Sequence, residues 1–231
     1  MSTFNKQQVL KAMSAAAMVP VFFNPDAEVA RKVLKACYDG GVRCFEFTNR
    51  GPQAAAVFRA LASYAGKLPG MILGVGSISF ARDARKFIRM GAGFVVGPQF
   101  VPGVARVCRF RHIPYMPGCG TVSEVGRAQR SGSDICKVFP GDVLGPGFVK
   151  ALLAPMPWSK IMVTGGVKPE KENLEAWFGA GATCVGMGSN LFPKDAIAAG
   201  DYARITELCS STLKTIELLR AGLPAQKCRG I

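Results

Sequence analysis

The chain alternates between short apolar runs and longer amphipathic segments, and this alternation most limits the fold that it can adopt. The short runs have the composition of strands buried on both faces, whereas the longer segments carry apolar residues at helical spacing. Glycines stand between a helix and the strand that follows it, as at 40–41, 91–93 and 179–181. About eight such units predict an α/β fold, a (β/α)8 TIM barrel, with a doubly wound open sheet as the competitor.

The predicted elements follow one another without a break that would mark a second domain. An N-terminal helix at 5–17 precedes the first strand, and an extended C-terminal helix at about 201–223 closes the chain. The predicted strands lie at 18–23, 43–47, 71–75, 94–96, 114–116, 133–139, 160–163 and 183–187. The predicted helices between them lie at 25–38, 52–65, 80–90, 102–111, 121–131, 145–153 and 169–178. We therefore expect residues 1–231 to form a single barrel domain.

Glycine spacing argues against a dinucleotide-binding open sheet. Gly74-Val75-Gly76 follows a predicted strand, but it lacks both the third glycine of a Rossmann fingerprint and the acidic residue expected after it. The barrel is therefore the favoured architecture, and we expect no cofactor.

The eight cysteines are scattered, and several fall inside predicted helices or strands. No two of them form a C-x-x-C pair, which argues against zinc ribbons and favours a reduced, cytoplasmic protein. An apolar run at 13–23 resembles part of a signal peptide, but Pro20 and the acidic residues after it argue against secretion. Nothing approaches the roughly 20 unbroken apolar residues of a membrane span, so no membrane partner is expected.

The net charge of +14 needs a separate explanation. Nucleic-acid binding, attraction of an anionic substrate and a solvated basic surface all remain open. Two basic clusters are predicted to form exposed faces: Arg82, Arg85, Lys86 and Arg89 in one, and Arg106, Arg109 and Arg111 in the other. No RNP-like strand, zinc finger or basic-region heptad accompanies them, so a nucleic-acid partner is not expected.

One lysine, Lys137, lies in the middle of the apolar stretch 133–140. An ammonium group on a strand buried on both faces is costly to desolvate and gives up its proton readily, and the neutral amine is a nucleophile. The alternative is a lysine at a strand end whose charged group reaches water. Glu46 is a second charge in similar surroundings, between two phenylalanines, and two lone charges on two barrel strands indicate a site.

Other polar residues gather where the predicted strands end, which is where barrel active sites lie. Thr48 and Arg50 share the parity of Glu46 on the second strand, while the phenylalanines of that strand face the helices. Glycine-rich turns follow strands seven and eight, at 164–166 and 186–190, and the backbone amides of such turns can bind a phosphate. The alternative is that these glycines only permit tight turns.

The sequence does not favour a metal site or a Ser-His system. The only histidine, His112, sits at a predicted helix end. Asp134 and Asp142 flank the lysine strand and could join Glu46 as metal ligands, but a single histidine in the chain argues against such a site. We therefore expect no metal.

Seven stretches, collinear from about residue 15 to residue 215, resemble one family of enzymes. They are Val19-Pro20-Val21, Glu46-Phe47-Thr48-Asn49-Arg50, Gly74-Val75-Gly76-Ser77, Pro117-Gly118 with Thr121 and Ser123-Glu124, Lys137-Val138-Phe139-Pro140, Thr164-Gly165-Gly166 and Gly188-Ser189. The sequence is similar to the class I aldolases that cleave 2-keto-3-deoxy-6-phosphogluconate (KDPG) and 4-hydroxy-2-oxoglutarate (KHG). Such an enzyme releases pyruvate and an aldehyde, glyceraldehyde 3-phosphate or glyoxylate, in a reversible reaction.

The resemblance implies a Schiff-base mechanism. Lys137 would attack the ketone of a 2-keto acid substrate, and the protonated imine would accept the electrons released when the C3–C4 bond breaks. Glu46 would assist loss of water from the carbinolamine, take the proton of the C4 hydroxyl and return a proton to C3.

The resemblance also implies the residues that bind the substrate. Arg50 and Ser77 would hold its carboxylate, and Phe139 would wall the pocket and keep water from the imine. The distal phosphate or carboxylate would meet Thr164, Gly165, Gly166, Gly188 and Ser189.

One departure from the family pattern concerns the substrate. Family members often place an arginine at the end of the first strand to hold the phosphate, and the matching residue is Phe23. Phosphorylated and non-phosphorylated substrates therefore both stay open. Relatives are commonly trimers, so we expect a homotrimer. The alternatives are a phosphosugar isomerase or epimerase barrel without covalent catalysis, and a non-catalytic basic barrel that binds anions or nucleic acid.

Overall fold

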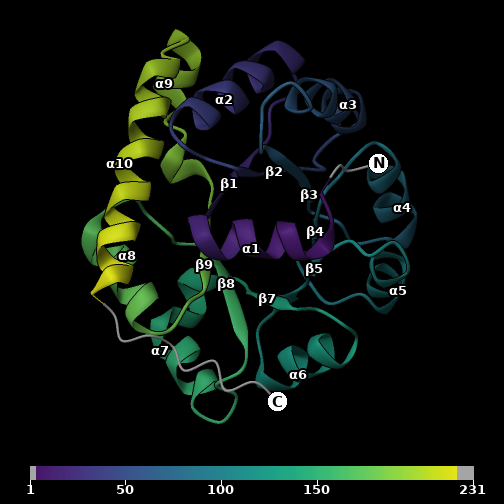
Figure 1. Ribbon diagram of the computed structural model, residues 1–231, viewed down its shortest axis with the longest axis vertical. Coiled ribbons are helices and arrows are strands. Elements are labelled where there is room, and N and C mark those ends of the chain that lie inside the picture. The colour runs from purple at the N-terminus through teal and green to yellow at the C-terminus, as the bar shows by residue number, and fades with distance from the viewer. Residues whose placement is uncertain (1–3, 223–231) are drawn as a thin grey trace.

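The computed structural model describes residues 4–222 and confirms the predicted TIM barrel (Figure 1). Parallel strands form a nearly closed ring, and helices surround it. Every pairing between neighbouring strands is parallel. The strands are β1 (Met18–Phe22), β2 (Cys44–Thr48), β3 (Ile72–Gly76), β4 (Val95–Val96), β5 (Tyr115–Met116), β6 (Gly118–Cys119), β7 (Ile135–Val138), β8 (Lys160–Thr164) and β9 (Cys184–Met187).

The strand order is β5-β4-β3-β2-β1-β9-β8-β7-β6, and its two ends are joined through Pro117. β5 pairs with β4, whereas β6 pairs with β7. Proline has no N–H group to donate to a strand ladder, so the chain changes partners at this residue. The carbonyl of Pro117 still accepts a hydrogen bond from the Lys137 amide, 2.9 Å away. The predicted fifth strand is therefore present, but Pro117 ends it and a short second half follows.

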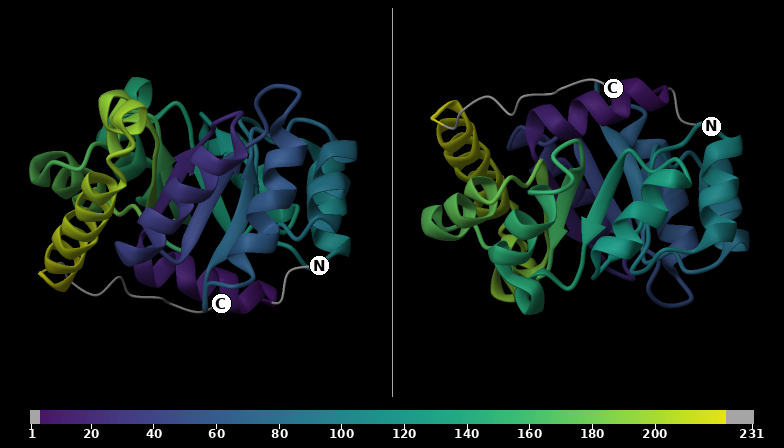
Figure 2. Two further views of the ribbon diagram at one scale, coloured as in Figure 1. Left: turned by 90° about the horizontal axis from the view of Figure 1, so that it is seen from above. Right: turned by 90° about the horizontal axis from the view of Figure 1, so that it is seen from below.

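The helices cover the outside of the ring and one of its ends (Figure 2). α1 lies across the end at which the strands begin, where Val9 and Met13 are fully buried. The opposite end, where the strands finish, is the one that barrels use for active sites. The helices are α1 (Lys6–Ala16), α2 (Ala27–Asp39), α3 (Ala54–Ala65), α4 (Ala81–Arg89), α5 (Pro102–Phe110), α6 (Val122–Arg130), α7 (Gly141–Leu153), α8 (Lys171–Gly179), α9 (Lys194–Ala199) and α10 (Tyr202–Ala221).

Three segments differ from the sequence-based expectation. α7 begins at Gly141 rather than at 145, and Gly145 adopts a non-helical backbone with φ 70° that kinks it. A 3-10 turn at Ser189–Leu191 and the short helix α9 were not predicted. The closing helix is confirmed as far as Ala221, and the last residue of its expected span lies outside the described residues.

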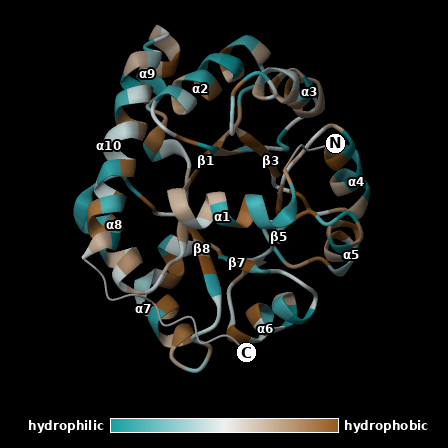
Figure 3. Ribbon diagram, viewed as in Figure 1, coloured by the Kyte–Doolittle hydropathy of each residue, from teal (hydrophilic) through white to brown (hydrophobic). Residues whose placement is uncertain are grey.

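The core is continuous and apolar. Hydrophobic residues concentrate on the strands and on the inward faces of the helices, while the outward faces are polar (Figure 3). The seven cysteines in the described chain are all buried and free, and Cys228 lies outside it. None of the helices within residues 4–222 is both long and apolar enough to cross a membrane.

Glycines inside the barrel leave room for larger neighbours. A Cβ atom at Gly74 would overlap the ring of Phe94, and one at Gly76 would overlap the Glu46 carboxyl group. Phe94 and Glu46 are both buried and cannot swing into solvent. These two glycines of β3 therefore define the space that the interior side chains occupy.

The substitution Gly74→Ala is expected to destabilise the fold by about 1–3 kcal/mol, because the buried Phe94 ring must move or strain. Urea unfolding followed by circular dichroism measures the change. Gly179→Ala is the matched control, since nothing lies within 4 Å of a Cβ atom there. A Gly74→Ala midpoint equal to that of wild type would contradict this packing.

Candidate active site

Glu46 projects from β2 into the barrel. Its neighbour Phe47 packs against Phe58 of α3, with ring centroids 6.5 Å apart, so Phe47 faces the helices. Side chains alternate along a strand, and Glu46 therefore faces the interior, as predicted. The overlap that a Cβ atom at Gly76 would have with its carboxyl group agrees with this orientation.

Lys137 projects into the same interior from β7. Its neighbour Cys136 faces α6, where its Sγ lies 3.9 Å from the carbonyl of Val125, so the alternation turns Lys137 inward. In one direction round the ring, β1, β9 and β8 lie between β2 and β7. In the other direction, β3, β4 and the divided strand β5/β6 lie between them. The lysine and Glu46 therefore face each other across the barrel.

Burial lowers the pKa of Lys137. The side chain is 7% exposed, and removal of its ammonium group from water is the largest cause of the shift. The Glu46 carboxyl group acts in the opposite direction and raises this pKa, whereas the Arg50 guanidinium lowers it further. The Nζ atom also lies 4.7 Å from the centroid of the Phe139 ring. A lysine in these surroundings holds its proton less firmly than a lysine in water.

Burial raises the pKa of Glu46, while Lys137 and Arg50 act to lower it. Glu46 is 1% exposed, and its Oε2 atom has no hydrogen-bond partner within the described chain. A buried carboxyl oxygen without a partner is uncommon in a folded protein and calls for an explanation. The two pKa shifts run in opposite directions, so the amine and the carboxyl group are closer in proton affinity than in water, as proton transfer requires.

Arg50 and Ser77 follow the adjacent strands β2 and β3 on the same side of the barrel mouth. The amide of Asn49 donates to the Gly76 carbonyl, 2.9 Å away, and joins the two strand ends. Arg50 is exposed, and Ser77 is half-buried with φ 60°, a conformation that costs a non-glycine residue about 1–3 kcal/mol. Such strain is concentrated at functional sites.

Thr48 does not line this part of the site. It is buried, and its hydroxyl donates to the Phe22 carbonyl at 3.4 Å. Its polar group is therefore engaged within the barrel wall, although its parity matches that of Glu46.

The turn after β8 has the conformation that glycine favours. Gly165 has φ 101° and Gly166 has φ 69°. A Cβ atom at Gly165 would lie 2.9 Å from Asp142 Oδ1, and one at Gly166 would lie 2.7 Å from the Asp142 Cβ atom. The tight-turn explanation of these glycines is therefore correct for the backbone, because the start of α7 packs directly against them.

The same turn also offers hydrogen-bond donors. Within residues 4–222, the amide N–H groups of Gly165, Gly166 and Gly188 have no acceptor. The Thr164 hydroxyl is buried and likewise without a partner in the described chain. Gly188 and Ser189 follow β9, the neighbour of β8, so these groups lie beside one another at the barrel mouth. The arrangement suits an anion.

Two asparagines hold the turns after β8 and β9 in place through hydrogen bonds that were not predicted from the sequence. Asn173 accepts a hydrogen bond from the Lys168 amide at 2.9 Å and donates to the Gly166 carbonyl at 3.2 Å. Asn190 donates to the Val167 carbonyl at 2.9 Å and so links the turn after β9 to the turn after β8. Asn190 stands beside a glycine turn, which is a sequence signal for such a bond, but its partner Val167 is identified only by the fold.

Phe23, at the end of β1, packs against Phe47 with ring centroids 5.7 Å apart. Its ring also approaches Gly51, where a Cβ atom would lie 3.7 Å away. The end of β1 therefore carries an apolar ring in place of a charged side chain.

The carboxylates weighed as metal ligands do not assemble. Asp134 forms an ion pair with Lys6 at 2.6 Å, and Asp142 packs against the turn after β8. In the part of the chain that the structure describes, no three His, Cys, Asp or Glu side chains come together to hold a metal ion.

Comparisons with known proteins agree on one family. The family model described as "KDPG and KHG aldolase" matches residues 9–208. A 2-dehydro-3-deoxy-phosphogluconate aldolase of Treponema pallidum is 30% identical over 91% of this chain and 99% of its own length. A KHG/KDPG aldolase of Escherichia coli K12 is 32% identical over 89% of this chain and 95% of its own.

One solved structure bears on the chemistry. It is a KDPG aldolase of Legionella pneumophila "with pyruvate captured at low pH as a covalent carbinolamine intermediate". It superposes with a TM-score of 0.79 at 27% identity, over 87% of this chain and 96% of that one.

The pH dependence of acetylation by acetic anhydride should reveal the neutral amine of Lys137, because only an unprotonated amine reacts. Peptide mass spectrometry reads the labelling of this residue alone. The midpoint is expected below about 10.4, the ordinary lysine value. It should fall further in Glu46→Gln, which removes a group that raises this pKa, and rise in Arg50→Gln, which removes one that lowers it. A midpoint that rises in Glu46→Gln would refute this electrostatic description.

Proposed function

The chain belongs to the KDPG and KHG aldolase family, whose members are lyases, and on this premise we propose that it cleaves a 4-hydroxy-2-keto acid through an imine on Lys137. The observation that carries the proposal is the placement of this lysine. Lys137 is the one buried lysine within residues 4–222, and it faces Glu46 across the barrel. Pyruvate and an aldehyde are the expected products.

The reaction begins with the neutral amine of Lys137. Its lone pair attacks C2 of the keto acid and forms a carbinolamine, which loses water to give a protonated imine. The carbinolamine named for the L. pneumophila enzyme requires an amine of this kind, which supports the assignment. Glu46 donates the proton that leaves with the hydroxyl group as water.

Cleavage follows from the positive charge on the imine. The Glu46 carboxylate takes the proton of the C4 hydroxyl, the C3–C4 bond breaks, and its electron pair passes to the imine to form an enamine. The C4 fragment leaves as an aldehyde. Glu46 then returns its proton to C3, and water releases pyruvate and the free amine. The unpartnered Oε2 atom of Glu46 is available for these transfers.

The rim residues hold the substrate at its two ends in this proposal. Arg50 binds the carboxylate beside C2 by a charge-assisted hydrogen bond, and the Ser77 hydroxyl assists it. Phe139, whose ring faces the Lys137 Nζ atom, shields the imine from water. The distal end meets the amides and hydroxyls of Thr164, Gly165, Gly166, Gly188 and Ser189.

The proposal leaves two candidates for the group at the end of the substrate far from C2, a phosphate and a carboxylate. The free amides after β8 suit a phosphate or a carboxylate, whereas the Phe23 ring offers no charge to a dianion. We also propose a homotrimer in solution, as the family resemblance implies, and light scattering during gel filtration would measure it. An isomerase or epimerase that needs no imine is the competing function.

Borohydride reduction in the presence of pyruvate separates the two functions. The proposal predicts that wild type gains the mass of a reduced pyruvyl group, located on Lys137 by peptide mass spectrometry. Lys137→Met should gain nothing, while Lys150→Met, which removes an exposed lysine, should react as wild type does. Trapping on another lysine, or none at all, would overturn the assignment.

The role of Phe23 can be measured with a matched pair of substrates. Phe23→Arg is expected to raise kcat/KM for KDPG by about tenfold or more, since a hydrogen bond to a charged group contributes about 1.5–3 kcal/mol. The same change should leave 2-keto-3-deoxygluconate, which lacks the phosphate, nearly unaffected. Phe23→Leu controls for loss of the ring. Equal effects on both substrates would place the distal group away from β1.

A further inference from the structure

A groove on the outer surface gathers basic side chains that the aldolase reaction does not use. It has a volume of about 650 Å³ and is lined by Arg59 of α3, by Arg82, Arg85, Lys86 and Arg89 of α4, and by Met90 directly after α4. We call it the α3–α4 groove. Arg82, Arg85, Lys86 and Arg89 recur at the helical spacing that places them on one face of α4. The proposed catalytic pair lies inside the barrel, on other elements.

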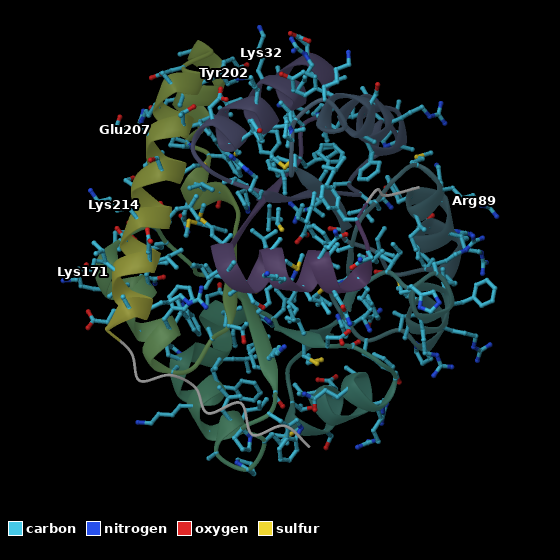
Figure 4. The ribbon with its side chains drawn as sticks, viewed as in Figure 1. Lys32, Arg89, Lys171, Tyr202, Glu207 and Lys214 are labelled. Carbon is cyan, nitrogen blue, oxygen red and sulfur yellow. The ribbon has the colours of Figure 1, made fainter. Side chains whose placement is uncertain are left out.

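The charges of this groove are largely unneutralised. Helices α3, α4 and α5 together carry seven basic side chains and a single acidic one, Asp83. Within residues 4–222, the one ion pair of Asp83 is with Arg82, at 4.0 Å. Arg89 points away from α4 into solvent (Figure 4). Like charges held this close repel one another, so the surface favours an anionic partner that brings several charges at once.

Two exposed phenylalanines flank the basic helices. Phe80, 56% exposed, precedes α4 and carries the Arg82 guanidinium over its ring at 4.9 Å. Phe110, 78% exposed, ends α5, with the Arg111 guanidinium 5.8 Å from its ring centroid. Gly103 allows the start of α5 to approach Ala81 of α4, so the two helices form one continuous surface. Exposed aromatic rings among cations are what unpaired bases stack on.

We propose that the α3–α4 groove, together with the exposed rings of Phe80 at the start of α4 and Phe110 at the end of α5, binds single-stranded nucleic acid without sequence preference. The cations track the phosphates, and the two rings stack bases. The exposed rings of Phe80 and Phe110 near these cations favour a partner that brings bases as well as phosphates, and so a nucleic acid over an anionic bilayer. A second copy of the same face would be repelled by its own charge. This inference goes beyond the aldolase activity and does not depend on it. It departs from the sequence-based expectation of no nucleic-acid partner, because the groove between α3 and α4 is visible only in the fold.

The test is fluorescence anisotropy with a labelled 20-nucleotide oligouridylate. Five phosphate contacts predict that affinity falls about 100-fold between 50 and 200 mM salt, because each contact on a single strand contributes about 0.7 to the logarithmic salt slope. A quadruple variant, R82Q/R85Q/K86Q/R89Q, should raise Kd by at least about tenfold at 50 mM salt and flatten the slope. The double variant R85Q/K86Q should also weaken binding, and its salt slope should fall by about half as much as that of the quadruple variant.

The control removes the same charge from scattered exposed positions that form no ion pair in the described chain. It is K150Q/K171Q/K194Q/K214Q, of which Lys171 and Lys214 are labelled in Figure 4. This variant should bind nearly as wild type does. Both quadruple variants should keep aldolase turnover, which separates this proposal from the catalytic one. Equal losses of affinity in the two quadruple variants would show that only net charge matters and would overturn the proposal that the groove binds the strand.

Stacking distinguishes a nucleic acid from other polyanions. The double variant F80A/F110A should weaken oligouridylate binding at least about fivefold with an unchanged salt slope, and it should leave heparin binding unaltered. Equal weakening of both would contradict base stacking. Binding to phosphatidylserine vesicles without oligonucleotide binding would assign the surface to a membrane and refute the proposal.

Discussion

The energetic cost of keeping a charged lysine inside an apolar barrel is the constraint on which the rest of the site depends. Lys137 is almost fully buried, and it has no ion-pair partner in the described chain to repay its desolvation. The amine therefore yields its proton more easily, and Glu46, buried on the opposite wall, holds its proton more firmly. Gly76 of β3 leaves room for the Glu46 carboxyl group, which an added Cβ atom would overlap. A barrel with a larger residue at this position could not hold Glu46 where it lies.

Much of this arrangement could be predicted from the sequence because its signals are local. The alternation of strands and helices follows from hydrophobic periodicity, and the inward direction of Glu46 follows from the two phenylalanines beside it. The position of Lys137 opposite Glu46 depends instead on the order of strands round the ring, which no local pattern contains. The second half of the fifth strand, after Pro117, has the same origin, because a proline can also end a strand with nothing after it, and only the closed ring shows which partner the chain meets next.

The turns after β8 and β9 show a different limit of sequence reasoning. Their glycines were visible, and both interpretations have support, because the backbone at Gly165 and Gly166 needs glycine and the amides of these two and of Gly188 have no acceptor in the described chain. The bonds of Asn173 and Asn190 were not predictable, since each joins a turn to a segment placed beside it only by folding. The basic face of α4 was predicted to be exposed and is exposed, but the groove it forms with Arg59 of α3 required the packed helices.

The most direct test of the central claim is the exchange of the pyruvate methyl protons with deuterium, followed by proton NMR in D2O. Enamine formation on Lys137 and proton return by Glu46 predict that wild type exchanges these protons. Lys137→Met should abolish the exchange, and Glu46→Gln should slow it strongly while borohydride still traps the imine. Exchange that persists in Lys137→Met, or that is indifferent to Glu46→Gln, would contradict the account.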